Sequence, residues 1–220
     1  MITIAEAVEE IVRKSPFLEE AIVDGIVNYT GLARQIMPEV EEKLMKDVQI
    51  GGVVMAIQRL RPKLSKLDIE HEVLDYLKKM GEIIVRSDLI DYTFKNSPTL
   101  LGKQQELLKV IQGEKDVFQA SSKGVYETNL VTSKKMLDQL NQIFTGEEII
   151  SKKENLASLT MRLPQDNTSV PGIYYYLLKK IAWEGINIVE VISTTNEFTL
   201  ILDKNDVNRT FGLLHNLVND

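Results

Sequence analysis

The sequence predicts an α+β protein in which an N-terminal helical domain, residues 1–80, precedes two βαββαβ units, residues 82–154 and 155–220. Apolar residues recur at helical spacing through the first of these segments. From Glu82 onward, β-branched and aromatic runs alternate with helical segments. The order β-α-β-β-α then occurs twice, about 70 residues apart, which indicates a duplicated structural unit.

The composition is that of a globular protein with an excess of acidic residues. Of its 220 residues, 44% are hydrophobic and 26% are charged, and the net charge is −6. This charge does not favour non-specific binding to nucleic acids or anionic membranes, because both need a basic surface. The absence of cysteine excludes disulfides, thiolate metal sites and cysteine nucleophiles. We find neither a signal peptide nor a membrane-spanning stretch, and we expect a cytoplasmic protein.

Six helices are expected before residue 81, and local sequence signals place their ends. The expected signals are Ser15-Pro16 between the first two helices, Thr30 as an N-cap, Pro38 in a first helical turn and Gly81 as a C-cap. Residues 50–60 are expected to form the helix before the last one.

The first unit has the expected order β-α-β-β-α-β. This is the ferredoxin-like arrangement of a four-stranded antiparallel sheet with two helices on one face. The expected strands are residues 82–94, 116–121, 125–131 and 147–151, and the expected helices are residues 100–111 and 132–144. The apolar side of the first helix comprises Leu100, Leu101, Leu107, Leu108 and Ile111. Gly124 is expected in the hairpin turn and Gly146 at the end of the second helix.

The second unit repeats this order as far as its second helix. The expected strands are residues 156–163, 186–193 and 197–203, and the expected helices begin after Gly172 and after Asp203. An apolar stripe of Ile173, Leu177 and Ile181 marks the first helix, which Gly185 ends. The last strand of the order is either missing or supplied from elsewhere.

Several motifs follow one another in residues 169–215, "SVPGIYYYLLKKIAWEGINIVEVISTTNEFTLILDKNDVNRTFGLLH". Pro171-Gly172 opens a helix, Glu184-Gly185 closes it, and an aliphatic strand ends at Asp203. In this order they resemble an ACT domain, especially the C-terminal regulatory ACT pair of aspartate kinases. The resemblance covers residues 156–218 well and residues 82–154 in layout only.

The resemblance implies that a small amino acid binds at the start of the helix in the second unit. Its carboxylate is expected to meet backbone amides around Val170, Gly172 and Ile173, because helix N-termini favour anions. Asp166 and Asn167 in the preceding loop are expected to hold the amino end.

Two further residues complete the expected site. Asn187 begins the next strand, which the ACT fold is expected to bring close to that loop, and Asn187 or Ile188 would line the far wall, within the chain or across an interface. The alternative is that Pro171-Gly172 forms only a helix-start turn and that the loop is only solvated. In the first unit Gly102 lies inside the helix rather than at its start, which does not favour a second site.

Catalytic motifs are absent from the sequence. Aspartate kinases carry a Lys-Phe-Gly-Gly motif ahead of the ACT pair, and neither this motif nor another phosphate-binding glycine loop occurs here. His71 and His215 lack a second ligand at helical spacing, and Glu147-Glu148 are interpreted as a solvated face. We therefore expect a non-enzyme with no catalytic residues, no metal and no cofactor.

The helical domain leaves two interpretations open. Residues 29–60 have the proportions of a helix-turn-helix, whose second helix, residues 50–60, would present Gln49, Gln58 and Arg59 to DNA. Residues 1–62 contain seven basic and ten acidic side chains, 7 − 10 = −3, which favours dimerisation or docking to a protein instead. The expected function is a homodimeric amino-acid sensor, and the alternatives are a transcription regulator and a regulatory subunit of an aspartate-kinase-like enzyme. No membrane partner is expected.

Overall fold

The computed structural model describes residues 2–64, 66–164 and 169–219. The chain divides after Glu72 into two compact units, named the helical domain and the sheet domain. This boundary lies earlier than residue 80 because Val73, Tyr76 and Leu77 at the end of α5 (Lys66–Leu77) pack into a core of the sheet domain.

The helical domain is built around one apolar core. Its helices are α1 (Ile4–Arg13), α2 (Pro16–Val23), α3 (Tyr29–Leu44) and α4 (Ile50–Leu60), followed by the short η1 (Arg61–Lys63). Helix α1 begins with a capping box, in which Thr3 and Glu6 satisfy each other's backbone amides. The expected break at Ser15-Pro16 is confirmed, since Pro16 is the first residue of α2.

Three of the expected helix signals in this part of the chain are wrong. Pro38 does not start a helix but lies inside α3, where the buried residues Leu32, Ile36 and Val40 keep one continuous apolar face. The N-cap of α3 is Asn28 rather than Thr30, and its side chain accepts a hydrogen bond from the amide of Gly31 at 3.0 Å. Gly81 is not a C-cap either, because its amide donates to the carbonyl of Arg162.

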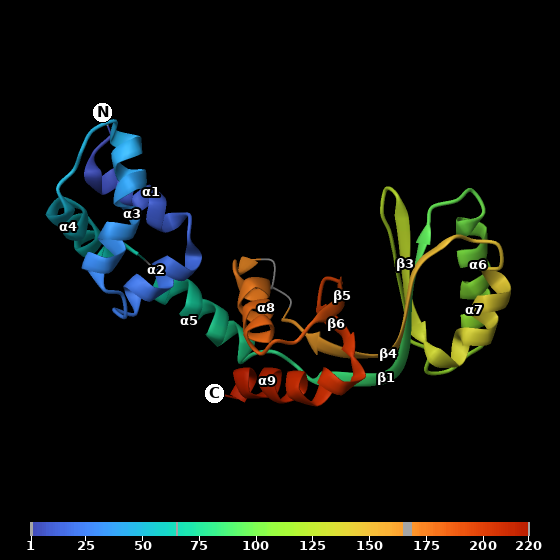
Figure 1. Ribbon diagram of the computed structural model, residues 1–220. Coiled ribbons are helices and arrows are strands. Elements are labelled where there is room, and N and C mark those ends of the chain that lie inside the picture. The colour runs from blue at the N-terminus through green and yellow to red at the C-terminus, as the bar shows by residue number, and fades with distance from the viewer. Residues whose placement is uncertain (1, 65, 165–168, 220) are drawn as a thin grey trace. The chain divides into compact units, whose positions relative to one another are not determined.

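The sheet domain contains a six-stranded sheet in which every pairing is antiparallel. Its strands are β1 (Ile83–Lys95), β2 (Gln119–Lys123), β3 (Glu127–Ser133), β4 (Ile149–Arg162), β5 (Ile188–Ser193) and β6 (Glu197–Asp203). The strand order is β2-β3-β1-β4-β6-β5. The two expected units therefore do not have separate sheets, and Figure 1 shows that one sheet runs through both.

The two long central strands, β1 and β4, belong to both units. The first repeat comprises residues 89–154, with the order β2-β3-β1-β4 across its part of the sheet. The second repeat comprises residues 156–219 together with residues 83–86 at the start of β1, in the order β5-β6-β4-β1. The last strand of the second repeat is thus supplied from elsewhere in the chain, which was one of the two outcomes the sequence allowed.

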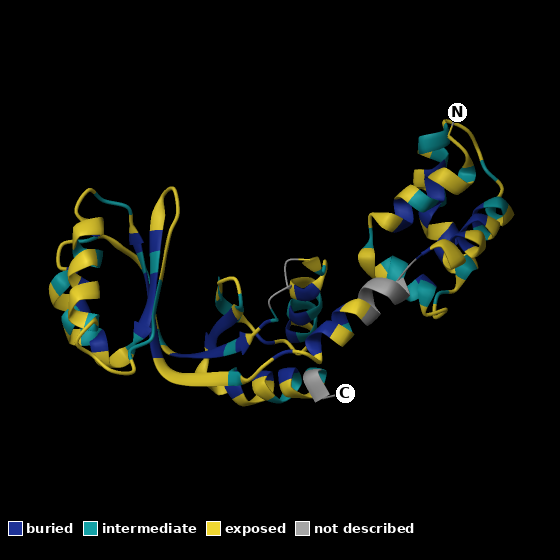
Figure 2. Cartoon of the chain, turned by 180° about the vertical axis from the view of Figure 1, so that it is seen from behind, coloured by how far each residue is buried: buried dark blue, intermediate teal, exposed yellow. Residues whose placement is uncertain are grey.

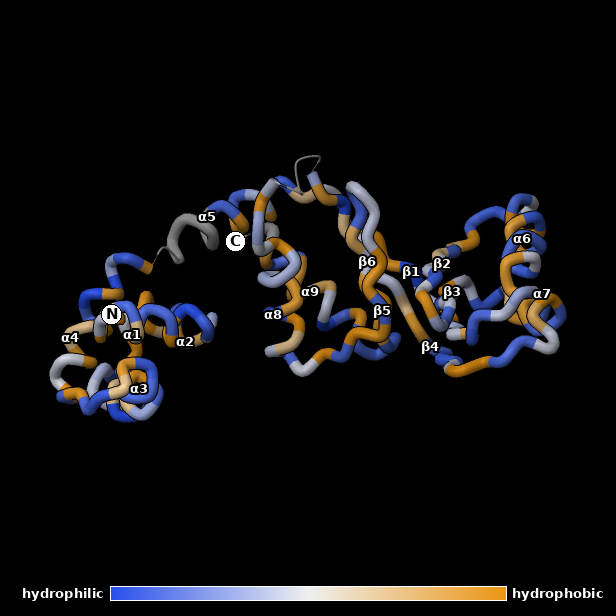
Figure 3. The backbone as a smooth tube through the Cα atoms, turned by 90° about the horizontal axis from the view of Figure 1, so that it is seen from above, coloured by the Kyte–Doolittle hydropathy of each residue, from blue (hydrophilic) through white to orange (hydrophobic). Residues whose placement is uncertain are grey.

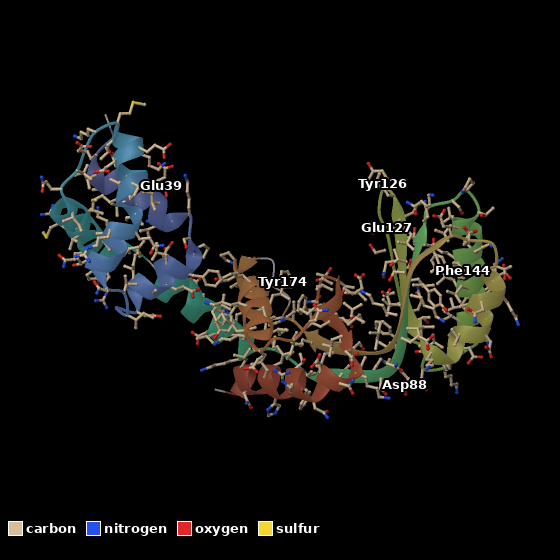
Figure 4. The ribbon with its side chains drawn as sticks, viewed as in Figure 1. Glu39, Asp88, Tyr126, Glu127, Phe144 and Tyr174 are labelled. Atoms are coloured by element: carbon tan, nitrogen blue, oxygen red, sulfur yellow. The ribbon has the colours of Figure 1, made fainter. Side chains whose placement is uncertain are left out.

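A pair of bulges marks the junction between the repeats. The register of β1 against β4 shifts between Arg86 and Leu89 and shifts again before Asp91. Asp88 and Asn155 both have a φ of 58°, a left-handed conformation that these two residue types tolerate better than most. Because one bulge lies on each strand, the second restores the register that the first shifts, and both bend the sheet. Asp88 is labelled at this junction in Figure 4.

Each repeat covers one face of its part of the sheet with two helices (Figure 1). The first repeat carries α6 (Leu100–Ile111), η2 (Lys134–Met136) and α7 (Leu137–Ile143), and the second carries α8 (Ile173–Trp183), η4 (Lys204–Asp206) and α9 (Val207–Asn219). Figure 2 shows buried residues along the strands and exposed residues on the outer sides of the helices. Leu101 and Leu108 were expected on the buried side of α6, but they are 54% and 48% exposed.

Three apolar cores stabilise the sheet domain. One lies under α6 and α7, and another lies under α8 and α9. The third is a small cluster of Leu89, Val131, Leu156 and Ile201. Neighbours along a strand point to opposite faces, so this cluster lies on the face that the helices do not cover. Figure 3 shows hydrophobic and hydrophilic residues interspersed along β1, β3 and β4.

Candidate ligand-binding site

The N-terminal end of α8, its head, is formed by a glycine in an unusual conformation. Gly172 is the N-cap and has a φ of 91°, which glycine adopts without the strain that a side chain would cause. The helix starts here because Ile173, Leu177 and Ile181 are buried on one face. Within the described residues no side chain caps this helix end, so the first backbone amides can bind an anion.

The predicted site residues around this head differ in what they offer to a ligand. Ile173 is buried and can contact a ligand through its backbone only, whereas Val170 is half-buried against the same core. Gly172 has no side chain and leaves the helix end open to close approach. Asp166 and Asn167 lie outside the described residues.

Sequence reasoning missed the side chains that flank this helix end. The hydroxyl of Tyr174 lies 3.0 Å from Ser193 Oγ, and its ring centroid lies 4.9 Å from that of Phe198. Asn196 holds the neighbouring chain, since the amide of Leu163 donates to its carbonyl at 2.8 Å. Tyr174 is labelled in Figure 4. Antiparallel pairing could have indicated these contacts, because the hairpin between β5 and β6 returns to the end of β4.

Asn187 and Ile188 lie at the other end of the second repeat. Ile188 pairs with Leu202, whereas the hairpin beside the head of α8 begins after Ser193. The two ends of the repeat are separated by the length of β4 from Leu156 to Arg162, which is six residue steps or about 20 Å. Within one chain Asn187 and the helix end at Gly172 therefore lie at opposite ends of the second repeat, because α8 runs antiparallel to β5 and carries the chain away from its own head.

Asn187 instead borders a separate hollow of about 340 Å³, together with Lys153, Val189 and Asp203. Its side chain is exposed there, and Ile188 is half-buried against the core beneath α8 and α9. These two residues can line the site at a helix head only if that head belongs to a second copy of the chain.

The head of α6, in the first repeat, holds a carboxylate. Ser97 Oγ donates to Glu147 Oε2 at 2.6 Å, and Thr99 Oγ1 donates to Oε1 at 2.7 Å. Lys103 Nζ lies 3.3 Å from Oε1. The two hydroxyl hydrogen bonds hold the pKa of Glu147 below its ordinary value. The interpretation of Glu147 as a solvated residue is wrong, since its side chain is only 2% exposed.

A second polar network lies on the face of the sheet that the helices leave uncovered. Asp91 is 2% exposed and accepts a hydrogen bond from Asn129 Nδ2 at 2.6 Å. The same nitrogen donates to Glu190 Oε1 at 3.1 Å and so joins β3 to β5. Burial raises the pKa of Asp91, and burial together with the charge of Asp91 raises the pKa of Glu190. A hollow of about 330 Å³ adjoins Asn129 and Glu190.

Other kinds of site find no counterpart in the described part of the chain. No three His, Cys, Asp or Glu side chains gather there as metal ligands. The ring of His215 stacks on Phe211, with a centroid distance of 5.7 Å. The side chain of His71 lies outside the description. Among the described helices, none is long and apolar enough to cross a membrane.

The fold has relatives of known structure, although no family model and no curated protein matches the sequence. Aspartate kinase from Clostridium acetobutylicum matches with a TM-score of 0.52 and 14% identity over 64% of this chain and 35% of its own. A structure of aspartokinase alpha and beta subunits matches with a TM-score of 0.50 and 15% identity over 64% and 99%. The ligand-free regulatory subunit of aspartate kinase from Thermus thermophilus matches with a TM-score of 0.50 and 10% identity over 63% and 98%.

These matches confirm the resemblance to the regulatory region of aspartate kinases at the level of the fold. The chain spans about a third of the Clostridium kinase, but it spans nearly the whole of the two subunit chains. The α+β class and the antiparallel sheet are confirmed as well. At these sequence identities the likeness concerns the architecture alone.

Proposed function

We propose that this protein is a non-catalytic, amino-acid-sensing regulatory protein whose ligand binds at the head of α8. The observation that carries the proposal is the open helix end at Gly172, which lies in a fold shared with aspartate kinase regulatory subunits. An anion gains from the amides and from the positive end of the helix dipole at such a position. An amino acid supplies that anion as its carboxylate.

The ligand would be oriented from two sides. Its carboxylate meets the amides that follow Gly172, and Asp166 and Asn167 hold its amino group. Tyr174 and Ser193 form a polar rim beside the helix head and can donate or accept hydrogen bonds. The open helix end at Gly172 supports the carboxylate site, and the resemblance to ACT domains supports the amino site.

A homodimer is part of this proposal. Strands β2 and β5 are the two edges of the sheet in the described part of the chain, and unpaired edges favour association with another strand. A second copy would also bring Asn187 and Ile188 to the far wall of the site, which a single chain cannot do. Ligand binding at such an interface would change the dimer and thereby signal to the helical domain.

A thermal-shift screen with the twenty amino acids tests the proposal. A ligand that binds only the native state raises the melting temperature, and the increase grows with the logarithm of the ligand concentration above its dissociation constant. Tyr174→Phe should then weaken binding of the active amino acid roughly three- to tenfold, as expected for one neutral hydrogen bond. The control is Tyr175→Phe, a neighbour on the same helix. A screen in which no amino acid changes the melting temperature would contradict the proposal.

Two alternatives remain for the molecule that this protein would regulate, a partner kinase chain and DNA. The match to separate regulatory subunits favours a partner kinase chain, which co-purification and ligand-dependent kinase rates would reveal. The transcription-regulator alternative rests on the exposed residues Gln49, Gln58 and Arg59 of the helical domain. Fluorescence anisotropy with duplex DNA over a salt series would test it, because phosphate contacts give a steep salt dependence.

A further inference from the structure

The carboxylate at the head of α6 does not come from the helix itself. A capping box would place a glutamate at the third helical position, which is Gly102 in this helix. Glu147 comes instead from the turn between α7 and β4, where Gly146 has a φ of 84°. The helix head and a distant segment of the chain are therefore joined through one carboxylate.

The surroundings of Glu147 are those of a bound carboxylate. Its two oxygens accept from two hydroxyls, and an ammonium lies against one of them. Ser97 Oγ also accepts from the amide of Leu100 at 3.1 Å, and Lys103 additionally donates to the carbonyl of Thr145. Charge-assisted hydrogen bonds of this kind are stronger than neutral ones. The two hydroxyls and the ammonium all contact the carboxylate oxygens of Glu147.

The second repeat lacks this carboxylate at the equivalent position. The amide of Lys95, at the end of β1, donates to the carbonyl of Glu148 at 3.0 Å. In the same way the amide of Arg162, at the end of β4, donates to the carbonyl of Glu82 at 3.4 Å. The residue before each acceptor is Glu147 in the first repeat and Gly81 in the second. The head of α8 therefore has no tethered glutamate from this position.

We infer that the head of α6 is a carboxylate-binding site which the protein fills with its own Glu147 side chain. The first repeat is thereby closed to free carboxylate ligands, whereas the head of α8, which no described side chain caps, is open to them. This deepens the proposed function by predicting one amino acid per chain. The part that concerns α6 does not rest on the proposed function, because a carboxylate that is not an amino acid can test it.

Removal of the tethered carboxylate should let a free one enter. The full chain carrying Glu147→Ala is melted in sodium acetate and, at equal ionic strength and pH, in sodium chloride. Acetate should raise the melting temperature of this variant by about 2–4 °C more than chloride does, as expected for a ligand present well above its dissociation constant. The wild-type protein should show no such difference, since Glu147 already occupies the site.

The matched control is Glu148→Ala. It removes the same charge from the next residue, whose side chain is 66% exposed and pairs with Lys95 on the surface. An acetate response in Glu147→Ala no larger than in Glu148→Ala would overturn the inference. If Glu147→Ala is unfolded in chloride, acetate should restore its helical circular dichroism signal, while Glu147→Gln, which fills the space, should fold without acetate. Failure of acetate to restore the fold would overturn the inference equally.

Discussion

The heads of α6 and α8 occupy equivalent places in the two repeats, yet their chemistry differs. The head of α6 holds the buried carboxylate of Glu147. The head of α8 has the left-handed Gly172 as its N-cap, and Gly81 stands where the first repeat has Glu147. The comparison teaches that a duplicated fold does not duplicate a binding site, because the site depends on a few residues at the ends of the same elements.

The repeats nevertheless share one sheet, and we expect them to unfold as one cooperative unit. Both use β1 and β4, so neither can lose its sheet without disturbing the other. The bulges at Asp88 and Asn155 bend these strands without breaking the pairing. Variants in the two ends of the domain should therefore reveal both their coupling and their different chemistry.

The largest effect is expected from matched truncations in the two helix-covered cores. Leu107 in α6 and Leu177 in α8 are both essentially unexposed. Leu107→Ala and Leu177→Ala should each lower the free energy of unfolding by about 2–5 kcal/mol through lost burial and a cavity. Because the repeats share two strands, each variant should shift the transition of both repeats together in urea. A urea transition that splits into two steps in either variant would show that the repeats unfold independently.

A somewhat smaller effect is expected in ligand binding. Asp166→Ala should reduce the affinity for the amino acid found in the screen by about 1.5–3 kcal/mol, the range for hydrogen bonds to charged groups. The control is Ser97→Ala at the head of α6, which should leave that affinity unchanged because the first repeat is closed. Calorimetry on both variants gives the answer. Equal losses would mean that both repeats take part in binding.

How far the sequence predicted this molecule depends on the kind of signal. Most helices and strands follow from apolar periodicity, and Gly146, Gly185 and Asp203 end or cap them as expected. Pro38 was misplaced because a proline usually marks a helix start, while here a continuous buried face overrides it. Local signals thus predict elements well and fail where packing decides.

The arrangement of the strands needed long-range information. The segment around Ser87-Asp88 reads as one strand of one unit, and only pairing with β4 shows that it serves two repeats. The same limit applies to the sites. Neither the place of Asn187 at the end of the repeat away from Gly172 nor the burial of Glu147 has a local signature, because both follow from how distant segments return to a helix end.

A loss of stability of intermediate size is expected from a substitution at the junction between the repeats. Asn155 is exposed and left-handed, so Asn155→Ala should cost about 1–2 kcal/mol, the penalty for placing a side chain with a Cβ but no local hydrogen bond in this conformation. Asn155→Gly should be neutral or slightly stabilising, because glycine adopts a positive φ freely. Urea unfolding of the pair checks this. Equal destabilisation by both substitutions would point to a contact of the side chain instead of the bulge.

The smallest effect concerns the buried Asp91, and its sign depends on pH. A pKa that burial raises in the folded state means that stability is highest when Asp91 is protonated and falls as the pH rises through the folded pKa. Asp91→Asn removes the buried charge and keeps an acceptor for Asn129, so it should raise the melting temperature at pH 7. The gain should disappear below the ordinary pKa of 3.8.

The gain from Asp91→Asn is expected to be small because the hydrogen bond from Asn129 and the charge of Lys153 already offset part of the burial cost. Asp75→Asn makes the same chemical change at an exposed position and should leave the melting temperature unchanged. Thermal melts of the two variants between pH 3 and pH 7 separate the cases. A loss of stability at pH 7 in Asp91→Asn would mean that the network with Glu190 needs the charge to hold β3 and β5 together. The hydrogen-bond network on the uncovered face would then stabilise the domain when Asp91 is ionised.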